Sequence, residues 1–195
     1  DPGDSFTKMD EPMGASRGLA DGSIDWGDYD NDGDLDLAAT GWDTAWNRRM
    51  IIFRKDAGES FTMSAEPMGA NQGVNSSVIQ WGDYDNDGDL DLAVAGWDGA
   101  NYRLIIYRNN GGDSFTNAVE PMGANQGVSG GAVRWGDYDN DGDLDLAVAG
   151  WSGANNRLII CRNNGGDSFT NAAEPMGVNQ GVSAGTVQWG DYAGD

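Results

Sequence analysis

Residues Trp81–Leu92 read Trp-Gly-Asp-Tyr-Asp-Asn-Asp-Gly-Asp-Leu-Asp-Leu, and the same twelve residues recur from Trp26 and from Trp135. A fourth copy starts at Trp189 and departs from the pattern after Tyr192. The four tryptophans lie 55, 54 and 54 residues apart, so the chain is a tandem repeat. Repeats of roughly this length are typical of solenoids, propellers and related arrays.

Each complete copy contains a loop in which five aspartates alternate around one glycine. In the second copy this loop is Asp83–Asp91, with the aspartates at positions 1, 3, 5, 7 and 9. Position 6 is Gly88, where a sharp turn needs a residue without Cβ, and position 7 can offer its backbone carbonyl. Because closely spaced carboxylates repel one another unless a cation lies among them, the loop indicates a bound divalent metal.

Calcium is the metal that suits this loop best, since it accepts about 6–8 oxygen ligands in flexible geometry, whereas magnesium requires a stricter octahedron. Zinc prefers His or Cys ligands, and the chain has no His and one Cys. An EF-hand does not fit, because position 12 of the loop is Val94 rather than Glu. A metal-free acidic turn is the other alternative, against which stand three complete copies of the ligand set. We expect about three Ca²⁺, one per complete loop, and none in the fourth, where Ala193 replaces a ligand.

The segments between the loops have the character of β-strands. No stretch shows a sustained apolar period of 3.6 residues, and short β-rich runs bounded by turn residues recur instead. In the second copy these runs are Ser77–Asp83, Leu90–Gly96, Arg103–Arg108 and Asp113–Val119. The last two are separated by Asn109–Gly112, a strong signal for a tight turn. Four short antiparallel strands per repeat predict one blade of a β-propeller.

The predicted fold class is therefore all-β, with about three complete four-stranded blades and a single strand at each end, which makes an incomplete propeller. We expect a strand of a preceding blade and a linker in 1–22, blades in 23–66, 77–120 and 131–174, and the first strand of a further blade in 185–195. The single strands are expected at Ser5–Asp10 and Gly185–Tyr192. Because propellers need about four to eight blades to close, a longer parent chain, a second chain or a filament is expected to complete the ring.

The loop pattern Asp-x-Asp-x-Asp-Gly-x-x-Asp-Leu, repeated about every 54 residues, resembles the FG-GAP/VCBS repeat family, which includes the propeller head of integrin α-subunits. The resemblance covers nearly the whole chain, although Trp-Gly stands here for Phe-Gly, and Ala-Gly-Trp for Gly-Ala-Pro. It implies calcium in the loop between the first and second strands of each blade. The ligands that it implies are Asp28, Asp30, Asp32, Asp34 and Asp36; Asp83, Asp85, Asp87, Asp89 and Asp91; and Asp137, Asp139, Asp141, Asp143 and Asp145.

Charge and composition exclude several classes of function. The formal net charge is −21 and the pI is about 4.1, which disfavours nucleic acid as a partner, since phosphate binding needs a basic face. Three bound dications would bring the formal charge to −15 (−21 + 6). No window reaches the roughly 18 apolar residues of a membrane helix, so membrane insertion is not expected. The single cysteine, Cys161, takes the place of Phe53 and Tyr107 in the other copies, which predicts a small buried apolar side chain.

A second group of recurring residues lies in the hairpins that begin with Gly-Trp. Each hairpin sets a tryptophan near an arginine, with an asparagine beside it in the second and third copies, so an aromatic plate with polar donors could bind a sugar ring. Packing against the next blade is the alternative role for these tryptophans. The candidate carbohydrate-binding residues are Trp42, Trp97, Asn101, Arg103, Trp151, Asn155 and Arg157. Asn75 begins one Asn-x-Ser sequon, a candidate N-glycosylation site.

The function expected from these features is a non-enzymatic, calcium-stabilised propeller segment for adhesion or assembly, secreted or at the cell surface. Catalysis has little support, because the chain has no His and its clustered carboxylates already have a role as ligands. Two alternatives stay open: a lectin-like propeller that uses the Gly-Trp hairpins, and a subunit of an extracellular filament. The expected partner is a protein or a glycan, together with self-association or a longer parent chain.

Overall fold

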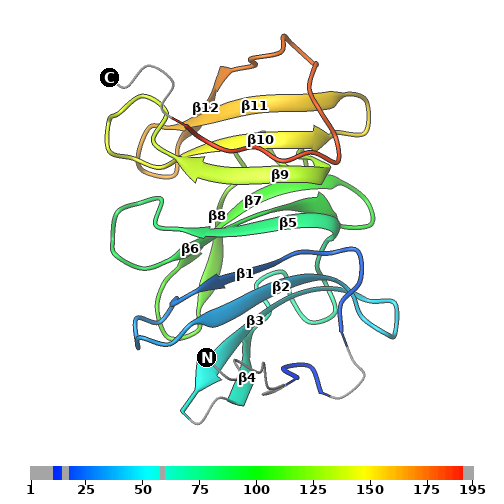
Figure 1. Cartoon of the computed structure of the whole chain (residues 1–195), viewed down its shortest axis with the longest axis vertical. Helices are drawn as coiled ribbons and strands as arrows, with labels where there is room; N and C mark the ends of the chain where they lie inside the picture. The colour runs from blue at the N-terminus through cyan, green and yellow to red at the C-terminus, as the bar shows by residue number, and fades with distance from the viewer. Residues whose placement is uncertain (1–10, 15–17, 58–59, 191–195) are drawn as a thin grey trace, which may run out of the picture.

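The computed structural model describes residues 11–14, 18–57 and 60–190, and these residues form three four-stranded antiparallel sheets (Figure 1). The first sheet comprises β1 (Ile24–Gly27), β2 (Asp36–Trp42), β3 (Arg48–Asp56) and β4 (Ser60–Ala65). The second comprises β5 (Asn75–Gly82), β6 (Asp91–Trp97), β7 (Tyr102–Asn109) and β8 (Phe115–Val119). The third comprises β9 (Ser129–Gly136), β10 (Asp145–Trp151), β11 (Asn156–Asn163) and β12 (Phe169–Ala173).

The all-β class and the four-stranded blades are confirmed. In the second repeat each observed strand begins and ends within two residues of its prediction. The prediction of a strand at Gly185–Tyr192 is wrong over its described part, because residues 185–190 do not form a strand. No described segment pairs with them there, and a strand needs a neighbour for its N–H and C=O groups. The predicted strand Ser5–Asp10 lies outside the described residues. The described residues contain no helix long and apolar enough to cross a membrane.

Burial along each blade explains the composition of its strands. The second strand β6, Asp-Leu-Ala-Val-Ala-Gly-Trp, is buried from Asp91 to Gly96 because the sheets on both sides cover it. A strand covered on both faces reads as a continuous apolar run rather than an alternating one. The outer strand β8 is more exposed, and accordingly carries Thr116 and Asn117. The third and fourth strands of each blade shift register at the same place, between Ile106 and Tyr107 in the second blade.

The hydrophobic core lies between the blades, which stack one on another along the chain (Figure 1). One cluster joins side chains of the first blade, such as Met50 and Ile52, to Leu92 and Ile105 of the second. The next cluster joins the second blade to the third and includes the fully buried Cys161, as its place at the position of Phe53 and Tyr107 predicted. Stability of each blade therefore depends on its neighbours, as in other repeat proteins.

The tryptophans that open the second and third repeats pack against the repeat before them. Trp81 stacks on Tyr29, with ring centroids 5.9 Å apart and 7° between the planes. Its ring also covers Gly27, where a Cβ would lie 2.7 Å from the indole Cδ1. The same arrangement recurs one blade later, where Trp135 stacks on a tyrosine and a Cβ at Gly82 would lie 2.4 Å from the ring.

The prediction that these tryptophans are core residues between blades is confirmed for Trp81 and Trp135, whereas Trp26 is 49% exposed. No described segment stacks on Trp26 as the first blade stacks on Trp81. Trp189 contacts the third repeat in the way that Trp135 contacts the second, although its own segment does not form a strand. Its indole Nε1 donates to the carbonyl of Arg134 at 3.1 Å, and its ring covers Gly136.

The glycine under each tryptophan supplies a test of this packing. Gly82→Ala should lower the free energy of unfolding by about 1–3 kcal/mol, because the added methyl group forces Trp135 out of its stacked position. Gly190→Ala is the matched control, since a Cβ at Gly190 meets no atom within 4 Å. Urea unfolding followed by tryptophan fluorescence measures both. Equal loss of stability in the two variants would contradict the packing described.

Candidate metal centre

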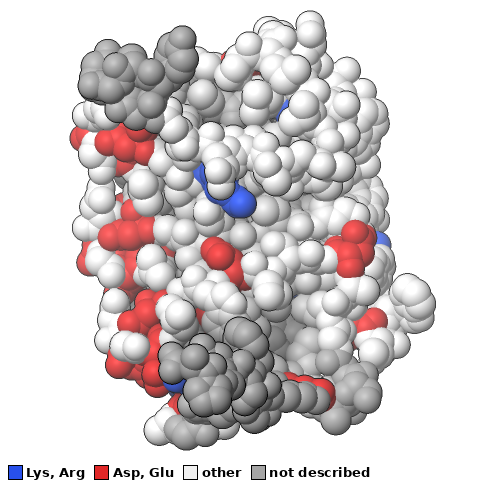
Figure 2. All heavy atoms as spheres, viewed as in Figure 1, with Lys and Arg blue, Asp and Glu red and all other residues white. Residues whose placement is uncertain are grey.

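The three aspartate loops connect the first strand of each blade to the second, and they gather along one edge of the stack (Figure 1). Carboxylates of these loops form a column of acidic groups on that edge (Figure 2). This is the position within the blade that the family resemblance implied. The edge carries much of the negative charge of the chain.

The backbone of each loop is held in a turn by its own first aspartate. In the second loop, Asp83 Oδ1 accepts a hydrogen bond from the Asp87 N–H at 3.1 Å, and Asp83 Oδ2 accepts one from the Gly88 N–H at 3.0 Å. Gly88 has φ +96° and Asn86 has φ +59°, so the turn uses two residues in the left-handed region. Glycine and asparagine are the residues that tolerate this conformation best. The first and third loops repeat these contacts.

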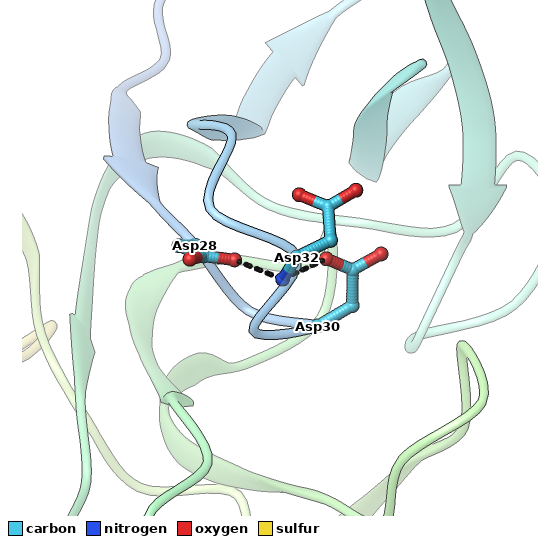
Figure 3. A group of neighbouring side chains, drawn as sticks. All are labelled: Asp28, Asp30 and Asp32. Atoms are coloured by element: carbon cyan, nitrogen blue, oxygen red, sulfur yellow. Dashed lines mark hydrogen bonds between the residues drawn. The ribbon is translucent and has the colours of Figure 1, made fainter. Parts of the chain in front are cut away.

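Within each loop three carboxylates converge, with one oxygen from each lying within 4.8 Å of the others. Figure 3 shows the first of these triads. The aspartates at positions 1 and 3 belong to all three triads; the third member is position 5 in the first loop and position 9 in the others. The triads are Asp28, Asp30 and Asp32; Asp83, Asp85 and Asp91; and Asp137, Asp139 and Asp145. The structure thus brings together nine of the fifteen predicted ligands by their side chains.

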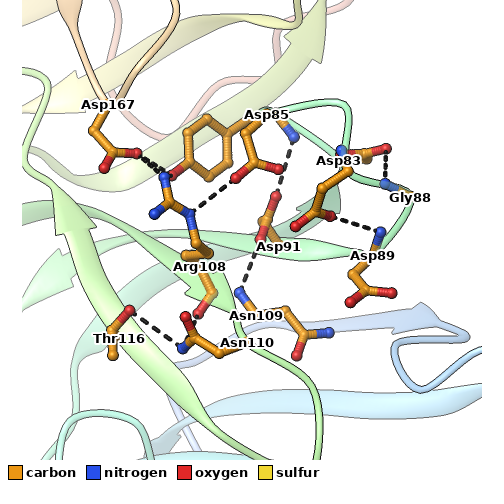
Figure 4. Close-up of polar contacts among 12 residues, drawn as sticks. Asp83, Asp85, Gly88, Asp89, Asp91, Arg108, Asn109, Asn110, Thr116 and Asp167 are labelled. Carbon is orange, nitrogen blue, oxygen red and sulfur yellow. Dashed lines mark hydrogen bonds and ion pairs between the residues drawn. The ribbon is translucent and has the colours of Figure 1, made fainter.

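The aspartate at position 9 is the buried member of the loop. Asp91 is fully buried, and its two carboxylate oxygens accept hydrogen bonds from the N–H groups of Tyr84 at 3.2 Å and Asn109 at 2.8 Å (Figure 4). Burial raises the pKa of Asp91 to about 7, against the lowering effect of these hydrogen bonds. Burial likewise raises the pKa of Asp36 to about 6 and that of Asp145 above its ordinary value. A cation beside such a carboxylate would favour its charged form.

The donor set of the second loop fits a hard divalent cation. Asp85 Oδ2 accepts a hydrogen bond from Arg108 Nε at 2.9 Å, while Asp85 Oδ1 is buried and has no hydrogen-bond partner. A buried carboxylate oxygen without a partner carries a large desolvation cost, which a bound cation would offset. All the converging groups are oxygens, the ligand type that Ca²⁺ and Mg²⁺ prefer. Asp83, Asp85 and Asp91 would hold the ion in this loop.

The side chain of the aspartate at position 7 contacts the preceding loop instead of joining the triad. Asp89 lies outside its triad, and its carboxylate accepts a hydrogen bond from Asn31 Nδ2 of the preceding loop at 2.7 Å. Asp143 accepts the equivalent bond from Asn86 at 2.8 Å. Neighbouring loops are therefore tied to each other side by side. The sequence analysis predicted a backbone carbonyl ligand at position 7, but it did not predict this hydrogen bond between neighbouring loops. The asparagine that recurs at position 4 of each loop was the sequence feature that could have indicated it.

A second link runs from the loop to the outer hairpin of the next blade. Arg108 contacts Asp85 of the second triad, the hydroxyl of Tyr84, and Asp167 at the β11–β12 turn of the third blade (Figure 4). The Tyr84 hydroxyl also donates to Asp167. The first blade repeats two of these contacts, since Arg54 Nη1 lies 3.0 Å from Asp113 Oδ2 and the Tyr29 hydroxyl donates to Asp113. One carboxylate, Asp85, thus belongs both to a triad and to the junction between blades.

Comparison with known protein families finds a match over the aspartate loops and the blade junctions. The pattern of the FG-GAP-like repeat matches residues 28–94 and again 83–148, which together span more than half of the chain. The chain belongs to the FG-GAP-like repeat family. Each match begins at position 1 of an aspartate loop and runs through the following loop, so the family pattern spans the blade junction as well as the loop. No curated protein matches the chain closely enough to be compared.

The Gly-Trp hairpins of these FG-GAP-like repeats form the opposite edge of the blades. Arg103 makes ion pairs with Asp98 at 2.9 Å and Glu120 at 2.8 Å, and Arg157 pairs with Glu174 in the next repeat. Trp97 packs against Tyr102, with ring centroids 4.7 Å apart. These contacts give the recurring arginines a role within the fold. Repeated sugar sites at Trp42, Trp97 and Trp151, with Asn101, Arg103, Asn155 and Arg157, stay a prediction.

The candidate glycosylation residue is poorly placed for modification. Asn75 is 9% exposed, and its Nδ2 donates to Asp21 Oδ2 at 2.9 Å while its Oδ1 accepts from Arg48 Nε at 2.9 Å. A glycan on Nδ2 would break the contact with Asp21. The structure therefore does not support N-glycosylation of the folded protein at Asn75.

Position 9 of the FG-GAP-like loop can be tested apart from metal binding. Asp91→Asn should cost about 1–3 kcal/mol of stability in metal-free buffer, because an amide cannot accept from both backbone N–H groups and one is left unpaired. Asp87→Asn is the control, because its exposed side chain retains an oxygen that can accept from the Asp89 N–H. Equal stability of both variants in chelator, measured by urea unfolding, would show that Asp91 has no structural role of its own.

Proposed function

We propose that this chain is part of an extracellular β-propeller scaffold in which bound Ca²⁺ fixes the stacking of the blades. The scaffold presents its surfaces for adhesion or assembly and performs no catalysis. Membership of the FG-GAP-like repeat family and the three stacked blades support the scaffold role. The triads support a divalent cation in each complete loop.

The observation that carries the proposal is the double role of Asp85. It is a member of the second triad, and through Arg108 it is joined to Asp167 of the third blade. A cation among Asp83, Asp85 and Asp91 would hold these carboxylates together against their mutual repulsion. The orientation of Asp85 would then be fixed, and with it the guanidinium that reaches across to the next blade.

Calcium would stabilise the folded chain by linkage, since the triads assemble only when the loops are folded. Extracellular calcium modules bind with dissociation constants near 10⁻⁴–10⁻³ M, which matches an extracellular setting. At a free concentration ten times that constant, three equal sites would add about 4 kcal/mol to the free energy of unfolding. The metal would thus be a large contributor to the stability of a chain this size.

The assembly role is supported by the exposed face of the first blade. Ile24 and Trp26 are 61% and 49% exposed, and Leu35 is 57% exposed. Their counterparts one repeat later include Trp81, which is buried against the first blade. The face of the first blade therefore suits a further blade, either from a longer chain or from a partner. Protein or glycan ligands are the proposed partners of the assembled scaffold.

The proposal predicts that calcium raises the thermal midpoint of unfolding and that excess chelator removes the gain. Asp85→Asn should weaken this response, because it removes one triad charge. Asp89→Asn is the matched control and should keep the full response, since its carboxylate lies outside the triad. Differential scanning calorimetry in calcium and in chelator makes the comparison. Identical midpoints in the two buffers would overturn the proposed function.

A further inference from the structure

Two neighbouring aspartate loops are contacted at once by a single asparagine, the last residue of β7 in the second blade. The backbone N–H of Asn109 donates to Oδ1 of Asp91, a triad member of the second loop, at 2.8 Å. Its side-chain Nδ2 donates to the backbone carbonyl of Tyr29, at position 2 of the first loop, also at 2.8 Å. Asn109 is 1% exposed, and hydrogen bonds shielded from water are stronger than exposed ones. One residue therefore connects a triad carboxylate to the backbone of the preceding loop.

The junction between the second and third blades repeats this connection. Asn163, the last residue of β11, donates through its N–H to Asp145 Oδ1 and through its Nδ2 to the carbonyl of Tyr84, each at 2.8 Å. It is likewise 1% exposed. A second connection lies at the surface, where Asn86 at position 4 of the second loop donates to Asp143 of the third, as its counterpart does between the first two loops. Each pair of neighbouring loops is thus joined twice, once in the interior and once at the surface.

The first blade has a lysine at the position of these asparagines, and its side chain contacts a different group. The backbone N–H of Lys55 donates to Asp36 Oδ1 at 2.8 Å, as the N–H groups of the asparagines do to their own buried aspartates. Its Nζ, however, pairs with Asp34 Oδ1 of the same loop at 2.8 Å. The asparagine thus occurs in the two blades that follow another described blade. This distribution supports a role for its side chain between loops rather than within one.

The loss of conformational entropy on ordering is a cost that neighbouring loops can share. Each loop holds two residues at positive φ, Asn86 and Gly88 in the second, and its carboxylates converge in that turn. A loop that its neighbour already holds in place loses less conformational entropy when it binds its own ion, which gives positive cooperativity. Repulsion between bound dications acts in the opposite direction, although salt screens the exposed part of it. The sign of the cooperativity therefore shows which effect is larger.

We propose that Asn109 and Asn163 are positioning residues that make neighbouring loops bind Ca²⁺ with positive cooperativity, together with the Asn–Asp pairs at the surface. The inference rests on the proposed calcium function and deepens it, because it states how the sites act on one another. Couplings between binding sites commonly change an affinity by about 5–150-fold. An ion in one loop is expected to raise the affinity of the next loop at least about fivefold. The loops would then fill together over a narrow range of calcium concentration.

The test is a calorimetric titration of the whole metal-free chain with Ca²⁺ at an ionic strength of about 0.15 M, where exposed charges are largely screened. Stepwise affinities, corrected for the number of free sites, should rise as the loops fill. Asn163→Ala and Asn86→Gly each remove one connection between the second and third loops, and each should lower the coupling severalfold. Asn140→Gly is the matched control, since it has the same φ of +59° as Asn86 but its side chain bonds to no described residue. It should leave the coupling unchanged.

Two results contradict the proposal: stepwise affinities that are equal or fall in the unmodified chain, and equal coupling in all three variants. Asn163 is buried, so the thermal midpoint in chelator checks that its variant folds. Asn86 is exposed, and glycine tolerates its positive φ, so Asn86→Gly decides the question if the other variant unfolds. Independent sites together with a calcium-raised midpoint would refute the coupling alone. A chain that binds no calcium would refute the proposed function itself, so the two failures are distinguishable.

Discussion

The packing of Trp81 and Trp135, each on the glycine and tyrosine of the repeat before it, is the contact on which the rest of this structure depends. The two larger buried clusters each combine side chains of successive blades, and only the smaller cluster of Ala39, Ile51 and Phe53 lies within the first blade. Trp81 meets Gly27 and Tyr29, and Trp135 meets Gly82 and its neighbouring tyrosine. The glycines are required there for space rather than for flexibility. The order of the array thus follows from one aromatic contact repeated along the chain.

The twelve-residue motif that begins with this tryptophan also contains the aspartate loop. The packing between blades and the candidate metal site therefore lie in one short segment of each repeat. The stacked tyrosine lies between positions 1 and 3 of the loop, and its backbone N–H is bound by the buried aspartate of position 9. Arg108 then joins Asp85 to the outer turn of the next blade. A change in the charge of the loop therefore acts directly on the junction between blades. This coupling is the physical basis of the proposed scaffold.

The spacing of the repeats was sufficient to predict the all-β class, the four-stranded blades and the convergence of the loop carboxylates. These follow from local patterns: alternating aspartates, Gly at position 6, and Asn-Gly turns. Links between blades could not be predicted, because the partners of Tyr84 and Asn86 lie 83 and 57 residues away in sequence. The burial of Asn75 was missed for the same reason, since Asp21 and Arg48 surround it only after folding. The exposure of Trp26 depends on which neighbouring blades are present.

Hydrogen exchange of backbone amides, followed residue by residue with and without calcium, tests the coupling between the loops and the blade junctions most directly. The informative amide is Trp135 N–H, which donates to Gln80 Oε1 of the preceding blade at 2.8 Å and lies outside the loop. The account predicts that calcium slows exchange at Trp135 as well as at the loop amides of Asp87 and Gly88. Slower exchange confined to the loop amides, with Trp135 unchanged, would contradict it.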